Sequence, residues 1–105
     1  MPAEAFLVVR SVVAEPLRAE FDRWYAGHHM PMAAMQFVAD KAWRFWSVTD
    51  PAVHYAVYRF ADLAALQSRL APEKFRPLVE DYDRAWPQGV TRTREILTLA
   101  ERFVA

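Results

Sequence analysis

The sequence has no cysteine, and only two of its 105 residues are glycine. Without cysteine the chain has no disulfides, no thiolate nucleophile and no Cys-ligated zinc or iron–sulfur site. Two glycines, Gly27 and Gly89, are too few for a glycine-rich phosphate loop or a dinucleotide fingerprint. A G-x-S-x-G nucleophile elbow is also missing. The sequence therefore excludes these kinds of nucleotide binding and of nucleophilic catalysis.

An excess of charge of either sign is missing too, because 13 Lys and Arg residues balance 13 Asp and Glu residues. Domains that bind DNA or RNA normally carry a clear basic excess, so no nucleic-acid partner is expected. No apolar run is long enough to span a bilayer. Residues 1–14 carry their first cation at Arg10, inside the apolar run, which is not the order of a signal peptide. We therefore expect a cytoplasmic protein with no membrane partner.

Hydrophobic residues are abundant, at 54% of the chain, and aromatic residues make up 14%. The hydrophobic share exceeds the usual 45–50% of globular domains. We expect residues 1–105 to form a single domain, since this length suits one core. A domain of this size buries a smaller share of its surface than a large one. Part of the apolar surface is therefore expected to meet a second subunit or a ligand.

The pattern of apolar residues and breakers predicts four strands and two helical regions. The first helix begins near Pro16 and is expected to end at Gly27, with a further turn over residues 32–38. The second helix begins at the N-cap Asp62 and is interrupted at Pro72 before continuing to Trp86. The predicted strands cover residues 6–13, 41–49, 53–60 and 90–103.

This order, strand, helix, strand, strand, helix, strand, is that of the ferredoxin-like βαββαβ fold. The predicted class is α+β, with a four-stranded antiparallel sheet and helices on one face. Both faces of the central hairpin are apolar, since Trp43 and Tyr55 fall on one face and Trp46 and Tyr58 on the other. We expect a second copy of the sheet to cover the face without helices. The alternative is that Trp43 or Tyr55 is simply exposed.

The densest group of chemically useful residues is the segment WYAGHHMP, residues 24–31. Histidine suits proton transfer near neutral pH. Two adjacent histidines point in different directions, so one of His28 and His29 is expected to face the interior. The alternative is that one of them caps the helix C-terminus and the other lies in solvent.

The pair Trp24-Tyr25 followed by His29-x-Pro31, after an apolar strand and an amphipathic helix, resembles the dimeric α/β-barrel superfamily, most closely its EthD-like branch. The resemblance covers nearly the whole chain in element order, but only about eight residues in motif detail. It implies two ferredoxin-like protomers packed sheet to sheet into a barrel, each with a pocket between its helices and its sheet. Members include monooxygenases, lactone isomerases, dehydratases, haem-dependent enzymes and proteins with no known activity.

Carried over by position, the resemblance makes His29 the motif histidine and the candidate catalytic residue. His28 takes the place where related sequences often have an acidic residue, which weakens the case for an acid–base pair. Aromatic side chains of the pocket would stack on a flat ligand, and Arg44 would pair with a carboxylate or phenolate. The candidate ligand-binding residues are Trp24, Tyr25, His28, Arg44, Trp46, His54 and Tyr58.

Each of these residues also has a plainer interpretation. The tryptophans pack in the core, Arg44 forms an ion pair between subunits, and His54 is exposed near the hairpin. The acidic residues Glu80, Asp81 and Asp83 are expected to form a solvated helix face. No histidine or carboxylate spacing typical of a metal site is present, so no metal and no cofactor are predicted. Haem is compatible with the chain only by family analogy.

Three functions remain open at this stage. The first is a small dimeric enzyme acting on aromatic or polyketide-like molecules, through proton removal by histidine or direct reaction of an electron-rich ring with O2. The second is a protein that binds such a molecule without changing it. The third is a structural dimerisation module, because a common fold hosts many functions.

Overall fold

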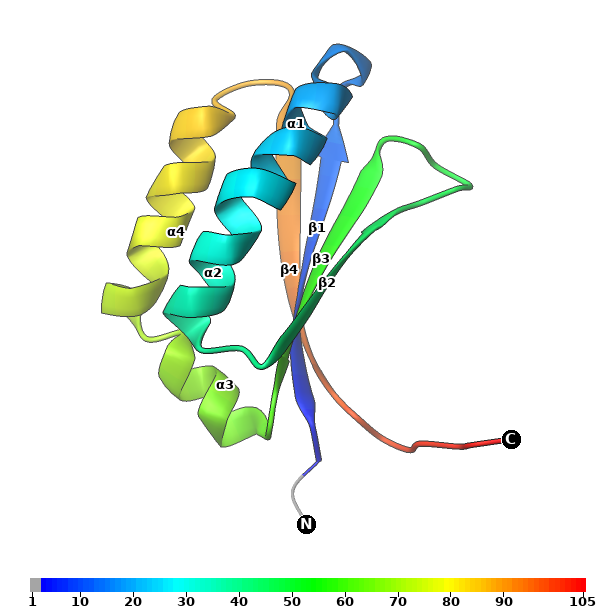
Figure 1. Ribbon diagram of the computed structural model, residues 1–105, viewed down its shortest axis with the longest axis vertical. Helices are drawn as coiled ribbons and strands as arrows, with labels where there is room; N and C mark the ends of the chain where they lie inside the picture. The colour runs from blue at the N-terminus through cyan, green and yellow to red at the C-terminus, as the bar shows by residue number, and fades with distance from the viewer. Residues whose placement is uncertain (1–2) are drawn as a thin grey trace.

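The computed structural model describes residues 3–105, and its four strands form one antiparallel sheet. The strand order is β2-β3-β1-β4, so the two outer strands in space are the second and the last in sequence (Figure 1). β1 lies in the centre and pairs with β3 on one side and β4 on the other. The strands are β1 (Ala5–Val13), β2 (Lys41–Trp46), β3 (Val53–Phe60) and β4 (Val90–Thr98).

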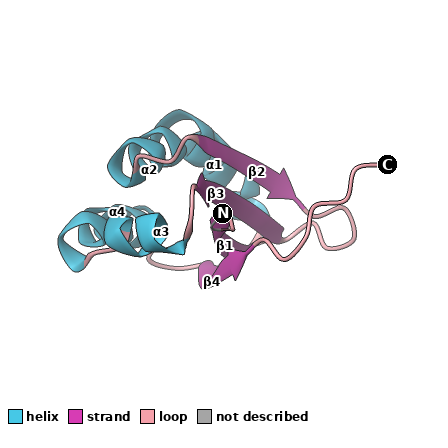
Figure 2. Ribbon diagram, turned by 90° about the horizontal axis from the view of Figure 1, so that it is seen from below, coloured by secondary structure: helices cyan, strands magenta, loops and turns pink. Residues whose placement is uncertain are grey.

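All helices of the described chain lie on the same face of this sheet (Figure 2). α1 (Arg18–Trp24) and α2 (Met30–Phe37) follow β1, and α3 (Leu63–Arg69) and α4 (Pro72–Ala85) follow β3. The predicted N-cap is confirmed, since the Asp62 carboxylate accepts a hydrogen bond from the Ala65 backbone N–H at 2.8 Å. The predicted α+β, ferredoxin-like architecture is confirmed as well.

The strand register shows which residues share a face. Directly paired residues in an antiparallel sheet lie on the same side, and each strand alternates. Leu7 pairs with Tyr58, and Val9 pairs with Ala56; these four residues are buried beneath the helices. The opposite face, which we call the outer face, carries the apolar residues Phe6, Val8, Val12, Trp43, Phe45, Tyr55, Val57 and Leu97.

The first helical region differs from the prediction at Gly27. Gly27 does not end the helix, because a π-helical segment, Tyr25–His29, joins α1 directly to α2. The helix ends instead beyond Phe37, where Val38 adopts a left-handed backbone with φ of 53°. Neither histidine is therefore at a helix C-terminus.

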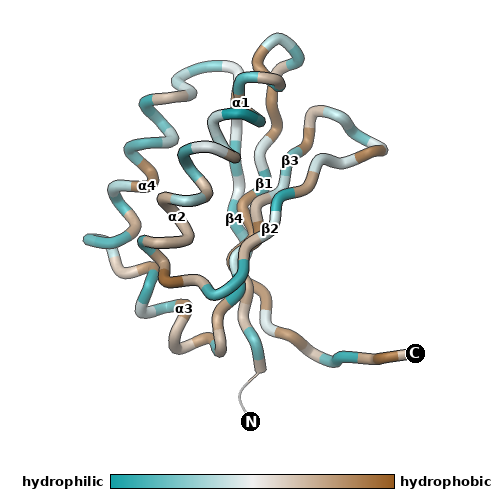
Figure 3. The backbone as a smooth tube through the Cα atoms, viewed as in Figure 1, coloured by the Kyte–Doolittle hydropathy of each residue, from teal (hydrophilic) through white to brown (hydrophobic). Residues whose placement is uncertain are grey.

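The last strand is shorter than predicted and ends at Thr98 rather than at residue 103. Thr98 pairs with Ala5, the first residue of β1, so the partner strand begins where β4 ends. One more backbone bond, from Leu99 N to Glu4 O, follows at 2.8 Å. The tail and the β2–β3 loop project away from the helices and carry exposed apolar residues such as Val48 and Phe103 (Figures 1 and 3).

Candidate functional site

A cavity opens between α2, α4 and the helix-covered face of the sheet. The space available to the centre of a water molecule is about 30 Å³, and the empty space including its open mouth is about 340 Å³. It is a narrow site with a wide entrance. The residues lining it are Leu7, Val9, Tyr25, His29, Ala33, Phe37, Tyr58, Phe75, Leu78, Val79, Tyr82, Arg92 and Arg94.

The π-helical segment brings His29 into this cavity. Such segments widen one turn of a helix and are frequent at functional sites. The His29 ring stacks on Trp24, with ring centres 4.5 Å apart and an angle of 18° between the planes. Tyr25 also packs edge-on against the His29 ring, with ring centres 5.0 Å apart. The imidazole is therefore buried and held in one orientation.

Asp81 on α4 bridges the two histidines of the motif. Its Oδ2 lies 2.8 Å from Nδ1 of His29, and its Oδ1 lies 2.9 Å from Nε2 of His28. The side chain of His29 is 7% exposed and that of His28 54%, so the carboxylate links a buried imidazole to one at the surface. His29 is the histidine that faces the interior.

Burial lowers the pKa of His29 below its ordinary value of 6.5, although the hydrogen bond to Asp81 acts in the opposite direction. Burial acts to raise the pKa of Asp81, but the hydrogen bonds and charges of the two histidines outweigh it and hold the pKa below 3.8. Near neutral pH the pair is thus a neutral imidazole beside an ionised carboxylate. An ionised carboxylate only accepts hydrogen bonds, so Nδ1 of His29 carries the proton and Nε2 carries the lone pair.

This arrangement is that of a general base. A carboxylate that accepts from one imidazole nitrogen fixes the tautomer and leaves the other nitrogen free to take a proton. Nε2 of His29 has no hydrogen-bond partner in residues 3–105, and the residue lines the cavity. The site can therefore remove a proton from a molecule in the cavity.

The sequence reasoning did not find Asp81, Arg92 or Arg94. Asp81 was expected on a solvated face; this is wrong, because its side chain is 15% exposed and paired with both histidines. Only one feature of the sequence pointed to a partly buried Asp81: it lies next to the apolar stripe of α4 that contains Leu78 and Tyr82. The alternation of the last strand could have shown that Arg92 and Arg94 share a face, because they are two residues apart. In the structure this is the face that the helices cover.

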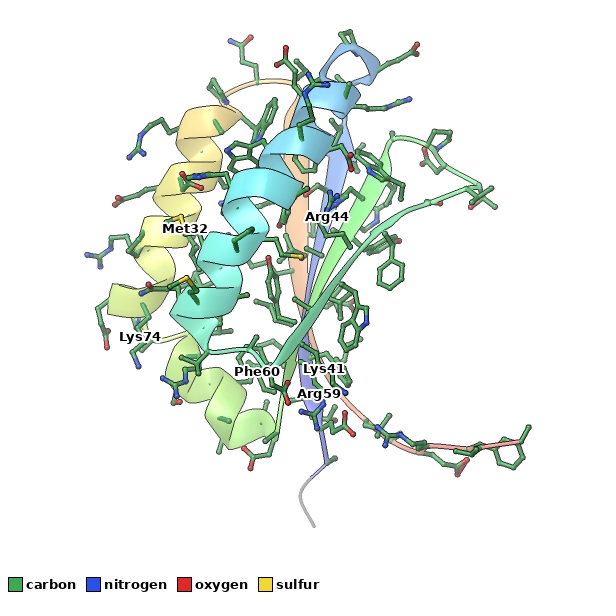
Figure 4. The ribbon with its side chains drawn as sticks, in the orientation of Figure 1. Met32, Lys41, Arg44, Arg59, Phe60 and Lys74 are labelled. Carbon is green, nitrogen blue, oxygen red and sulfur yellow. The ribbon has the colours of Figure 1, made fainter. Side chains whose placement is uncertain are left out.

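A second polar cluster lies beside the cavity, beneath α1. Arg44 reaches from β2 toward α1 (Figure 4), and its Nη1 donates to Oδ1 of Asp22 at 3.0 Å. Trp46 Nε1 donates to the same oxygen at 2.8 Å. Arg44 Nη1 also lies 3.3 Å from Nε2 of His54. Arg44 thus forms its ion pair within the chain.

His54 is fully buried, so the interpretation of an exposed histidine is wrong. Its ring packs against Phe21, Tyr25 and Trp46, and its Nδ1 has no partner in the described residues. Burial, followed by the positive charge of Arg44, lowers the pKa of His54 to about 4. A neutral His54 accepts a hydrogen bond from Arg44 and helps to fix it.

The structure separates the predicted site residues into three groups. Tyr25, His29 and Tyr58 line the cavity. Trp24 and His28 support His29, by stacking on its ring and by bonding to Asp81. The remaining three, Arg44, Trp46 and His54, belong to the second cluster. Tyr25 separates the two sites, with its ring 5.0 Å from His29 and 4.8 Å from His54.

In residues 3–105 there is neither a group of side chains for a metal ion nor a helix that could span a membrane. No group of three or more His, Asp or Glu side chains there is arranged to hold a metal ion. Within that same stretch, every helix is too short or too polar to cross a membrane.

Comparison with known proteins shows a likeness of fold. No protein-family model matches the chain, and no curated protein matches it significantly. A mutant of SnoaB from Streptomyces nogalater, described as a cofactor-independent oxygenase, matches with a TM-score of 0.71 and 21% identity over 95% of this chain and 96% of its own. HapK from Hahella chejuensis matches with a TM-score of 0.65 and 13% identity over 97% of this chain and 98% of its own.

An EthD-family protein from Bacillus halodurans matches with a TM-score of 0.66 and 14% identity over 88% of this chain and 96% of its own. Identities at this level establish the fold and leave the reaction open. The chain therefore shares its ferredoxin-like fold with these proteins, and the resemblance to EthD-like proteins is confirmed at the level of fold.

Proposed function

We propose that this protein is a small dimeric enzyme in which His29, oriented by Asp81, removes a proton from an aromatic or polyketide-like molecule in the cavity. The observation that carries the proposal is the 2.8 Å bond between Asp81 Oδ2 and His29 Nδ1, with the other ring nitrogen left free beside the cavity. A positioned base of this kind typically contributes 10²–10⁴-fold to a rate.

Proton removal from an electron-rich ring yields a carbanion or phenolate, which can react directly with O2. The likeness to SnoaB, described as a cofactor-independent oxygenase, supports oxygenation without a cofactor as one outcome. Isomerisation or dehydration begins with the same proton transfer. The base is therefore the part of the proposal common to all three reactions.

The lining of the cavity favours a flat ligand. Tyr25, Phe37 and Tyr58 are aromatic, and rings stack or meet edge-to-face with favourable energies. Sites for drug-sized ligands usually measure 300–1,000 Å³, which is far more than the narrow inner space seen here. Binding therefore requires side chains that line the cavity, such as the half-buried Val79 of α4, to move outward.

The outer face supports the proposed dimer. Trp43 and Phe45 on β2 and Leu97 on β4 are each more than a third exposed. The apolar residues Val57 and Phe6, on the two strands between them, lie on the same face. Contiguous apolar surface of this kind marks interaction sites in soluble proteins. Two copies packed through these faces would form the barrel of the superfamily, leaving each cavity on the helix side.

A second candidate is a dimer that binds the same kind of molecule without changing it. The narrowness of the inner cavity favours this function, since little of a substrate fits without rearrangement. The hydrogen-bonded pair of His29 and Asp81 at the cavity wall favours an enzyme. Only the enzyme would transfer a proton from the bound molecule, and this transfer can be measured.

The test uses 2-tetralone, a flat ketone with acidic C–H bonds, in D2O. The wild-type protein should speed deuterium uptake at the acidic carbon, measured by mass spectrometry. His29→Asn should remove the acceleration, and Asp81→Asn should reduce it by about tenfold to a hundredfold. Glu80→Gln, an exposed neighbour of Asp81, is the matched control and should behave as wild type. Exchange that is equal in wild type and His29→Asn would refute the proposal.

A further inference from the structure

The wall that β4 gives to the cavity is cationic. Arg92 and Arg94 are two residues apart, so they share the face that the helices cover, and both line the cavity. Neither Asp nor Glu is among the described residues that line it. Two arginines, no carboxylate and a neutral His29 give the lining a formal charge of +2.

Neighbouring carboxylates balance only part of this charge. Arg92 Nη1 lies 3.0 Å from Oδ1 of Asp83, which is itself mostly exposed. Arg94 has no carboxylate within 4.0 Å in residues 3–105. Asp81 is occupied by the two histidines. Arg94 is exposed as a whole, but partial burial of its guanidinium, followed by the charge of Arg92, lowers its pKa. The like charges of Arg92 and Arg94 repel each other, and an anion bound by both guanidinium groups would reduce this repulsion.

Aromatic rings of α4 hold both arginines in place. The Arg92 Cζ lies 4.0 Å from the ring centre of Tyr82, and the Arg94 Cζ lies 4.8 Å from that of Phe75. The Tyr82 hydroxyl is fixed in turn by Ser11 Oγ at 2.6 Å. Asp83 takes one edge of the Arg92 guanidinium, while no carboxylate pairs with Arg94 in residues 3–105. The remaining N–H groups match the geometry of a carboxylate.

We infer that Arg92 and Arg94 form an anion subsite of the cavity, and that the ligand is an aromatic carboxylic acid bound through its carboxylate. The aromatic part lies among the tyrosines and Phe37, and its placement beside His29 rests on the proposed function. The anion subsite itself does not depend on proton transfer.

The test compares 2-naphthoate with 2-naphthamide, which has nearly the same shape and no charge, by titration calorimetry. The naphthoate should bind about tenfold or more tightly than the naphthamide, because hydrogen bonds between two charged groups are stronger than those to a neutral amide. Its affinity should fall as salt rises, and that of the amide should not. Equal binding of the two compounds, or no binding of naphthoate at millimolar concentration, would overturn the inference.

Variants assign the effect to the subsite. Arg94→Gln and Arg92→Gln should each weaken naphthoate binding about tenfold and leave naphthamide binding unchanged. Arg76→Gln, which removes an exposed arginine from α4, is the matched control. Arg94→Lys keeps the charge and should retain part of the affinity, even if Arg94→Gln impairs folding. Wild-type affinity in both Gln variants would contradict the assignment.

Each of the two proposals can be refuted without refuting the other. His29→Asn keeps both arginines, so it should still bind naphthoate about tenfold or more tightly than naphthamide. If naphthoate binds as expected and 2-tetralone shows no His29-dependent exchange, the subsite stands and the proposed base does not. If exchange depends on His29 and the two naphthalene compounds bind equally, the subsite alone is wrong.

Discussion

Single residues in this protein act through partners far away in the sequence. His29 and Asp81 are 52 positions apart, and Arg44 and Asp22 are 22 apart. In each case a carboxylate pairs with a less exposed group, the His29 ring or the Arg44 guanidinium. Burying that polar group without its partner would be unfavourable. Asp81 thus fixes the orientation of His29, and Asp22 fixes that of Arg44.

The two buried histidines predict that stability falls in acid. Burial lowers the folded-state pKa of both His29 and His54 below the unfolded value near 6.5, and that of His54 to about 4. The unfolded chain therefore binds more protons below pH 6.5. The free energy of unfolding is highest above pH 6.5 and declines as the pH falls toward 4, by roughly 3 kcal/mol from His54 alone.

Urea unfolding at pH 7.5, 5.5 and 4.5 measures this decline. His54→Gln keeps a hydrogen-bond acceptor for Arg44 and removes the titration, so its stability should vary less with pH than that of wild type. A wild-type free energy that is flat between pH 7.5 and 4.5 would contradict the burial of the neutral rings.

At the scale of elements, the π-helical segment is the main departure from the expected pattern. It lets one uninterrupted helical path run from Arg18 to Phe37 while two successive histidines both reach Asp81 on α4. Gly27 lies within it and has no atom within 4 Å of an added Cβ. Gly89, by contrast, has φ of +81°, and an added Cβ would lie 2.6 Å from Leu17 Cδ1.

The two glycines should therefore respond in opposite ways to alanine. Gly27→Ala should raise the free energy of unfolding by about 0.5–1 kcal/mol, because glycine is unfavourable inside a helix. Gly89→Ala should lower it by about 1 kcal/mol or more, since alanine is strained at positive φ. Chemical denaturation of both variants makes the comparison. Destabilisation by Gly27→Ala would mean that the helix ends there, as the sequence pattern had indicated.

These elements also show what the sequence could and could not predict. Strand alternation correctly placed Tyr58 and Trp43 on opposite faces of the sheet, because that pattern is local. The link between His29 and Asp81 depends on how two helices pack on one sheet, which no local pattern encodes. The end of β4 was misplaced for a similar reason, since it depends on where β1 begins.

At the scale of the whole molecule, the sheet has one face covered by helices and an outer face that is largely apolar. Phe45 lies on the outer face and is 52% exposed. If copies pair through this face, Phe45→Glu should place a charge in the interface and raise the dimer dissociation constant by a hundredfold or more. Native mass spectrometry at micromolar concentration should then show monomer.

Met35→Glu is the control for this variant, because Met35 is an exposed apolar residue on α2, on the helix side. It should remain dimeric. A wild-type protein that is monomeric at the same concentration would show that the outer face is not a self-association surface.

The central claim is that Asp81 holds His29 as a neutral base with its free nitrogen toward the cavity. Nitrogen-15 NMR of the imidazole side chains at pH 7.5 tests it without a substrate. The account predicts that His29 carries its proton on Nδ1 and none on Nε2, and that Asp81→Asn abolishes this preference. A His29 protonated on Nε2 in the wild-type protein, or one unchanged in Asp81→Asn, would contradict it.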